Sequence, residues 1–94
     1  MSSYTALIDG RTGAYGVYFP DLPGCTAMGP TIEKAVLNAA KAMRDWADAT
    51  VERGGTISEP RAIEALLADP AVSEDIAAGA VLRSVPLLAA ACFP

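Results

Sequence analysis

The 94-residue sequence contains no histidine and only two cysteines, Cys25 and Cys92. Without histidine, the chain lacks the commonest general base, the usual partner of a serine or cysteine nucleophile, and the commonest metal ligand. Two cysteines cannot supply the four paired ligands of a structural zinc site. We therefore expect no cofactor and no metal, and we interpret the cysteines as free thiols, although a disulfide between them stays open.

Basic residues are also scarce, with seven lysines and arginines against 11 acidic residues and a net charge of −4. Tight binding to nucleic acid requires a clustered basic surface, whereas these seven residues are spread along the chain. Direct RNA binding, with tyrosines stacking on bases, is therefore a weak alternative carried by Tyr4, Tyr15 and Tyr18. A basic protein partner fits the charge balance better.

Long hydrophobic runs are missing as well. The longest apolar run, from Val85 to Phe93, is much shorter than a membrane span and contains Pro86. The first residues do not have the basic and apolar regions of a secretion signal. A chain of this length is enough for one domain. We therefore expect a soluble, cytoplasmic protein that makes no contact with a membrane.

The first third of the chain has the pattern of three short strands. Residues 4–8 and 15–19 are rich in strand formers, residues 9–13 contain two glycines typical of a hairpin turn, and residues 25–28 form a third short run. The two prolines within residues 20–24 interrupt the strand pattern. The simplest arrangement is an antiparallel meander.

The strongest periodic signal follows, between Thr31 and Arg53. Apolar residues recur there at helical spacing, Thr31 is a suitable N-cap and Gly54 follows the end, which predicts one long amphipathic helix. Ser58 and Pro60 predict a second helix that runs to Ala68. A further helix is expected over 70–77, and a strand over 80–85 that ends, or lies at a sheet edge, at Pro86.

This order of elements predicts an α+β fold, in which the long helix covers one face of a small antiparallel sheet. The sheet would consist of the three-stranded meander and the C-terminal strand. One helix cannot cover both faces, so we expect the second face and the sheet edges to be uncovered. Such surfaces favour association, and we expect a homodimer or homotetramer.

The most distinctive stretch is the loop from Phe19 to Cys25, with the sequence FPDLPGC. Two prolines fix φ there, and Gly24 permits a positive φ, so the loop should be rigid. One interpretation is a connector that sets the strand register. The other is a preformed surface that presents Asp21 and Leu22 to a partner at low entropic cost. Leu37 lies among charged positions of the long helix and is a further contact candidate.

The sequence from Tyr15 to Cys25, YGVYFPDLPGC, resembles the HicB antitoxin family of bacterial toxin-antitoxin systems. The resemblance continues through Glu33-Lys34-Ala35, Asn38-Ala39 and Trp46. It covers residues 3–60 clearly and residues 80–87 weakly. It implies a partial RNase H-like fold and a partner of the HicA type, a toxin that cleaves messenger RNA with a histidine and that the antitoxin occludes.

Under this resemblance we expect the toxin to be bound by the uncovered face or edge of the sheet, by the loop from Phe19 to Cys25, and by Leu37 of the long helix. Asp21 is the best candidate for an acidic group that faces a basic toxin. The complete set of candidate contact residues is Tyr18, Phe19, Asp21, Leu22, Pro23, Gly24 and Leu37.

The chain departs from the family pattern at its C-terminus, where the family's separate DNA-binding segment is missing. We interpret residues 1–88 as a single HicB-like domain and residues 89–94 as an apolar tail, and we expect no direct DNA binding. One alternative is an orphan HicB-like interaction module without a toxin. A metal-dependent nuclease is a weaker alternative, because its candidate carboxylates are scattered over Asp9, Asp21, Glu33, Asp45 and Asp48.

Overall fold

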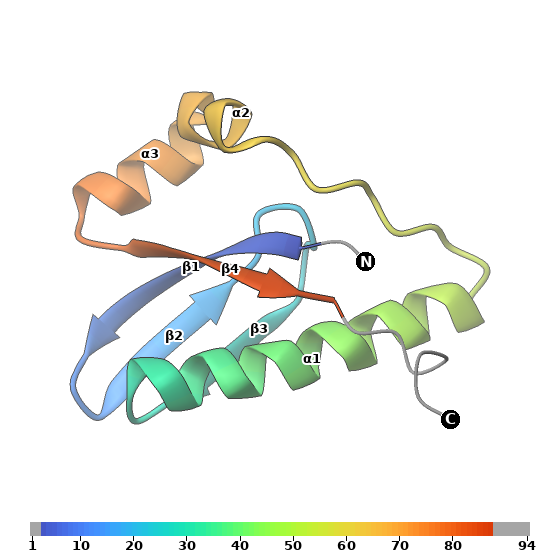
Figure 1. The fold of residues 1–94 in the computed structure, drawn as a ribbon, viewed down its shortest axis with the longest axis horizontal. Helices are drawn as coiled ribbons and strands as arrows, with labels where there is room; N and C mark the ends of the chain where they lie inside the picture. Colours follow the sequence, from blue (N-terminus) through green and yellow to red (C-terminus); the bar gives the residue numbers. More distant parts are fainter. Residues whose placement is uncertain (1–2, 88–94) are drawn as a thin grey trace.

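The structure, a computed structural model, describes residues 3–87 and has an α+β fold with one four-stranded antiparallel sheet. The sheet lies between two helical layers, with α1 on one side and the shorter α2 and α3 on the other (Figure 1). The strand order is β3-β2-β1-β4, which confirms the predicted meander with a C-terminal strand added beside β1. The elements are β1 (Ser3–Arg11), β2 (Ala14–Tyr18), β3 (Thr26–Gly29), α1 (Ile32–Glu52), α2 (Ile63–Ala68), α3 (Pro70–Ala77) and β4 (Val81–Pro86).

The first hairpin is longer than the sequence pattern suggested. Strand pairing continues through Gly10 and ends at the pair Arg11 and Ala14, so only Thr12 and Gly13 form the turn. Gly13 has a φ of +92°, in the left-handed region that side chains with a Cβ rarely adopt. The prediction that residues 9–13 form the turn was therefore wrong at its start.

Helix α1 confirms the predicted long amphipathic helix. The Thr31 hydroxyl oxygen accepts a hydrogen bond from the backbone N–H of Lys34 at 3.0 Å, which caps the first turn. The helix packs on the sheet through small or unbranched side chains, with Ala35, Ala39 and Met43 fully buried. Short side chains at this interface allow the helix to lie close to the strands.

The closest approach of α1 to the sheet is at Gly29, the last residue of β3. A Cβ placed on Gly29 would lie 2.5 Å from the backbone nitrogen of Ala35 and 2.8 Å from its Cα. Such distances are much shorter than ordinary van der Waals contact, and backbone atoms cannot move aside easily. The absence of a side chain at Gly29 therefore sets the distance between α1 and β3.

The second face of the sheet is partly covered, and the expectation that it is uncovered was wrong. Strand β1 is buried on both sides, because consecutive residues of a strand point to opposite faces and Ala6, Leu7 and Ile8 are all less than 2 % exposed. Leu7 packs with Leu66 of α2, Val72 of α3 and Ala80 in a small second core. The β3 side of this face is more open, as the 71 % exposure of Met28 shows.

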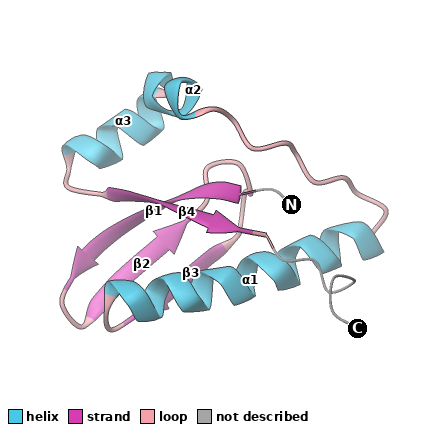
Figure 2. Ribbon diagram, in the orientation of Figure 1, coloured by secondary structure: helices cyan, strands magenta, loops and turns pink. Residues whose placement is uncertain are grey.

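Helix α2 begins at Ile63, three residues later than Pro60, so the predicted start was wrong. A long loop connects α1 to α2 instead (Figure 2). Two side chains of the sheet layer hold this loop: Tyr4 donates from its hydroxyl to the carbonyl of Ser58 at 2.5 Å, and Asp21 accepts from the backbone N–H of Arg61 at 2.9 Å. These bonds tie the loop to β1 and to the β2–β3 loop as it passes from the end of α1 to α2.

The remaining elements follow the sequence pattern. Helix α3 covers the predicted residues 70–77, with Asp69 as its N-cap. Strand β4 lies at the edge of the sheet beside β1 and ends at Pro86, as expected. The tail predicted for residues 89–94 lies outside the described residues.

We predict that Gly29→Ala destabilises the fold by about 1–3 kcal/mol, because the added methyl group meets the backbone of α1. Gly16→Ala is a matched control in the neighbouring strand, since its nearest contact is the Asp9 carboxylate at 3.4 Å. Urea unfolding of both variants and the wild type measures the difference. Equal stability of the two variants would contradict the close approach at Gly29.

Candidate functional site

A groove of about 440 Å³ lies between the β2–β3 loop and the start of α3. Five of the seven predicted contact residues line it: Tyr18, Phe19, Leu22, Pro23 and Gly24. Its other lining residues are Pro20, Cys25, Thr26, Asp69, Ala71 and Val72. We call this feature the α3 groove. Most of its lining side chains are apolar, and its volume is within the range of about 300–1,000 Å³ common for ligand sites.

The loop side of the α3 groove is rigid. Phe19 and Leu22 are 2 % and 1 % exposed, so their side chains anchor the loop in the core and form the wall of the groove. Two backbone hydrogen bonds fold the loop, from Leu22 N–H to the Phe19 carbonyl and from Cys25 N–H to the Leu22 carbonyl. The indole N–H of Trp46 donates to the carbonyl of Pro23 at 3.1 Å and ties the loop to α1. Pro23 and Gly24 themselves are exposed.

Asp21 is held by a residue that the sequence analysis did not single out. Arg61 donates to both carboxylate oxygens of Asp21, from its Nε at 2.5 Å and from its backbone N–H at 2.9 Å. The side chain of Asp21 is only 8 % exposed. The carboxylate expected to face a partner is thus engaged within the chain.

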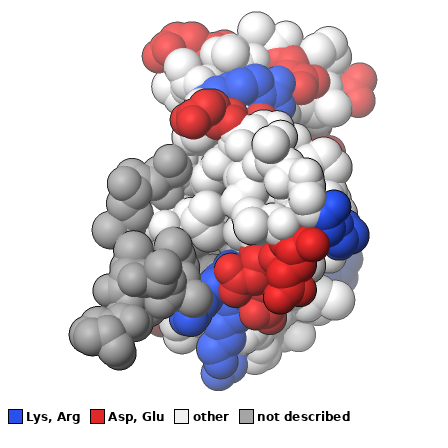
Figure 3. Space-filling view, turned by 90° about the vertical axis from the view of Figure 1, so that its right-hand side faces the viewer, with Lys and Arg blue, Asp and Glu red and all other residues white. Residues whose placement is uncertain are grey.

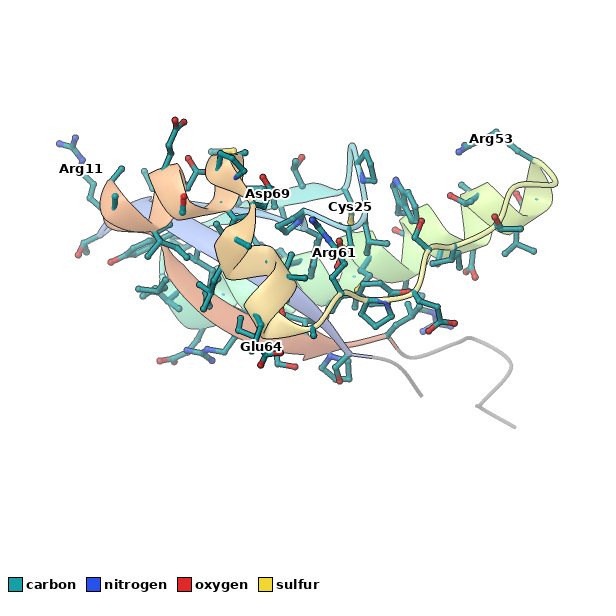
Figure 4. The ribbon with its side chains drawn as sticks, turned by 90° about the horizontal axis from the view of Figure 1, so that it is seen from above. Arg11, Cys25, Arg53, Arg61, Glu64 and Asp69 are labelled. Atoms are coloured by element: carbon teal, nitrogen blue, oxygen red, sulfur yellow. The ribbon has the colours of Figure 1, made fainter. Side chains whose placement is uncertain are left out.

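Arg61 also joins the loop to the second helical layer. Its Nη1 donates to Asp69 at 3.2 Å, and Asp69 in turn caps α3 by accepting from the N–H of Ala71 at 3.0 Å. Figure 4 looks down on α2 and α3 and shows Arg61 beside the β2–β3 loop, with Asp69 and Cys25 nearby. The hydrogen bond from Ala71 and the Arg61 guanidinium lower the pKa of Asp69. Hydrogen bonds to Asp21 and Asp69 raise the pKa of Arg61.

Tyr18 forms a second link between the layers. Its hydroxyl donates to the carboxylate of Asp75 on α3 in a short hydrogen bond. Burial, and then this hydrogen bond, raise the pKa of Tyr18 well above its usual value. Cys25, on the same groove, is a buried free thiol whose pKa burial raises. Cys92 lies outside the described residues.

Leu37 is not part of this site. It is 59 % exposed on α1, which packs on the opposite face of the sheet from α2 and α3. Leu37 lines a smaller hollow of about 160 Å³ together with Ala40, Lys41, Arg44 and Pro86. The structure thus places six of the predicted contact residues in or beside the β2–β3 loop and the seventh, Leu37, on α1.

The net charge of the chain is located in one segment. Residues 59–77, which form the end of the long loop, α2 and α3, contain five acidic residues and one basic residue, whereas the rest of the chain contains six of each. In the upper part of the molecule in Figure 3, where α2 and α3 lie, most of the charged side chains are accordingly acidic. The acidic residues of this segment are Glu59, Glu64, Asp69, Glu74 and Asp75.

The carboxylates proposed for a nuclease do not form a metal site. Within residues 3–87, no three acidic, cysteine or histidine side chains are grouped so that they could hold a metal ion. Over the same residues, no helix is both long and apolar enough to cross a membrane.

The fold and the sequence place the chain in a family. A sequence model described as the HicB_like antitoxin of bacterial toxin-antitoxin system matches residues 4–87. The chain therefore belongs to the family of HicB-like antitoxins. A search of curated proteins finds no significant match.

Solved structures of HicB antitoxins are similar to this chain. The Burkholderia pseudomallei antitoxin HicB matches with a TM-score of 0.75 and 29 % identity, over 93 % of this chain and 64 % of that chain. The N-terminal domain of the same antitoxin matches with a TM-score of 0.72 and 28 % identity, over 92 % and 98 %. A HicA3 and HicB3 toxin-antitoxin complex matches with a TM-score of 0.73 and 26 % identity, over 92 % and 98 %. The chain thus spans about two thirds of the longer HicB structure.

We predict that Arg61→Ala loosens α2 and α3 from the sheet, because it removes the side-chain links to both Asp21 and Asp69. Amide hydrogen exchange of residues 63–77 should become faster while that of α1 is unchanged. Arg53→Ala, at the C-cap of α1, is the control for loss of an exposed arginine. Unchanged exchange in Arg61→Ala would show that this link does not hold the layer.

We also predict that stability falls as the pH rises above about 10, the usual pKa of tyrosine. The folded state favours the neutral form of Tyr18, so this stabilisation is complete below pH 10 and is lost as the tyrosine ionises. Thermal unfolding followed up to pH ~11 should show a smaller loss in Tyr18→Phe. Some loss should persist in that variant, because burial also raises the pKa of Tyr4. Identical pH profiles would contradict the assignment.

Proposed function

We propose that this chain is the antitoxin of a type II toxin-antitoxin system, which binds a HicA-like toxin and covers its RNA-cleaving site. The observation that carries the proposal is the family match over residues 4–87. The similarity to the HicB3 fold supports it, because a structure of HicB3 together with the toxin HicA3 has been solved. The antitoxin acts here by protein contact and carries out no reaction of its own.

We propose that the contact surface includes the rigid β2–β3 loop. Pro23 and Gly24 are its exposed positions, while Phe19 and Leu22 act from the core by holding its shape. Asp21 contributes through Arg61, which fixes the loop against α2 and α3. Such a surface needs little ordering when a partner binds, which favours affinity. Leu37 belongs to a separate face and would require a second contact.

The orphan interaction module is the second candidate function. The acidic composition and the preformed loop would serve any basic protein partner equally well. In both cases we expect cytoplasmic location and no direct DNA binding from this chain. Association into a homodimer or homotetramer remains a prediction, and sedimentation of the purified chain tests it.

The proposal is tested by searching the neighbouring gene for a HicA-like protein and expressing that protein together with the chain. We expect the toxin to arrest growth when expressed alone, and the chain to restore growth and to co-purify with the toxin. RNA cleavage by the purified toxin should stop when about one chain is present per toxin molecule.

Purified chain incubated with RNA, or with an RNA and DNA hybrid, and magnesium is the control for an activity of its own. Cleavage by the chain alone would favour the nuclease alternative. A toxin that remains active at excess chain would contradict the antitoxin proposal and leave the orphan module.

A further inference from the structure

We propose that the α3 groove is the docking site for a positively charged segment of the partner protein, which inserts an apolar side chain between the β2–β3 loop and α3. This inference rests on the proposed function and names the surface and the chemistry by which the toxin is held. The two sides of the groove belong to different layers of the fold, so the segment would contact the sheet and the helical cover together.

The first argument is the shape and lining of the groove. Its loop wall is held by the buried Phe19 and Leu22, and its helical wall by the buried Val72 of α3. A rigid apolar hollow loses little conformational entropy when an apolar side chain enters it. Thr26 and Ala71, which also line the groove, are exposed and lie on its accessible rim.

The second argument is an apolar side chain that extends the surface beyond the groove. Met28 lies two residues after Thr26 in β3, so the two side chains point to the same face of the sheet. Met28 is 71 % exposed, the largest exposed fraction among the large hydrophobic side chains of the described residues. Methionine is adaptable and is frequent at surfaces that bind other proteins. Met28 thus adds an exposed apolar side chain on the face of β3 whose residue Thr26 lines the groove.

The charge of the segment 59–77, which we call the acidic layer, determines which kind of partner can occupy the groove. The segment 59–77 carries the whole net charge of −4, and its residues Asp69, Ala71 and Val72 form one side of the groove. A nucleic acid is repelled by this charge, and a second copy of the chain would present the same acidic layer. A segment rich in lysine or arginine is attracted instead, and complementary charge raises the rate of association.

The direct test is to fill the groove from its rim. Ala71→Trp places a large side chain in the groove, while Ala77→Trp places the same side chain at the exposed far end of the same helix. We expect Ala71→Trp to weaken binding to the HicA-like toxin by about tenfold or more, and Ala77→Trp to change it by less than about threefold. Binding is measured by calorimetry with a catalytically inactive toxin, and folding is checked by circular dichroism.

A second pair of variants does not depend on tolerance of tryptophan. Met28→Ala and Val51→Ala each shorten an exposed apolar side chain, the first beside the groove and the second on α1. Neither should disturb the core, and only Met28→Ala should weaken binding, by about fivefold or more.

Glu74→Lys and Asp48→Lys form a third pair, which tests the charge. They change the net charge equally, but only the first lies in the acidic layer. Glu74→Lys should therefore slow association more than Asp48→Lys.

The outcomes separate this inference from the proposed function. If the wild type binds the toxin and Ala71→Trp, Met28→Ala and Glu74→Lys bind it equally strongly, the groove assignment is wrong and the antitoxin role is unaffected. A wild type that does not bind the toxin would overturn both. A dimer of the isolated chain that dissociates in Ala71→Trp, with toxin binding unchanged, would assign the groove to a second copy and contradict the inference.

Discussion

The burial of β1 on both faces is the constraint on which the rest of the structure depends. Ala6 and Ile8 face α1, whereas Leu7, between them, faces the opposite side, and all three are almost completely inaccessible. A strand of this kind needs a cover on each side. Helix α1 supplies one cover, and α2 and α3 supply the other. The chain therefore has to return across the sheet after α1, and the long loop from Gly54 to Ala62 follows from this requirement.

The sequence predicted the parts of the fold that depend on local patterns. The helical period between Thr31 and Arg53 and the glycines of the first hairpin are signals that neighbouring residues carry. The second cover was missed, although the consecutive apolar residues Ala6-Leu7-Ile8 do not alternate with polar ones and so indicate a strand covered on both faces. The start of α2 was misplaced because Ser58 and Pro60 resemble a helix start, while tertiary hydrogen bonds hold this segment extended.

In the candidate site, too, the parts that depend on local sequence were predicted and the parts that depend on distant residues were not. Tyr18 and four loop residues predicted as partner contacts line one groove, and the shape of that loop is encoded in its own prolines and glycine. The other wall comes from α3, and the pairing of Asp21 with Arg61 joins positions 40 residues apart, for which no local pattern exists. The net charge of the chain was known from its composition, but the position of that charge beside the groove depends on how the chain folds. The proposal that this chain holds a basic partner rests on these two features, the preformed groove and the acidic segment 59–77 beside it.

The most direct measurement is the hydrogen-exchange footprint of the chain in complex with its HicA-like toxin. The account predicts slower exchange in the loop and β3, residues 20–29, and in the first turn of α3, residues 70–73, because both walls of the α3 groove would be covered. Exchange on the exposed side of α1 should be unchanged. A complex whose protection is confined to α1, with the groove exchanging as in the free chain, would contradict it.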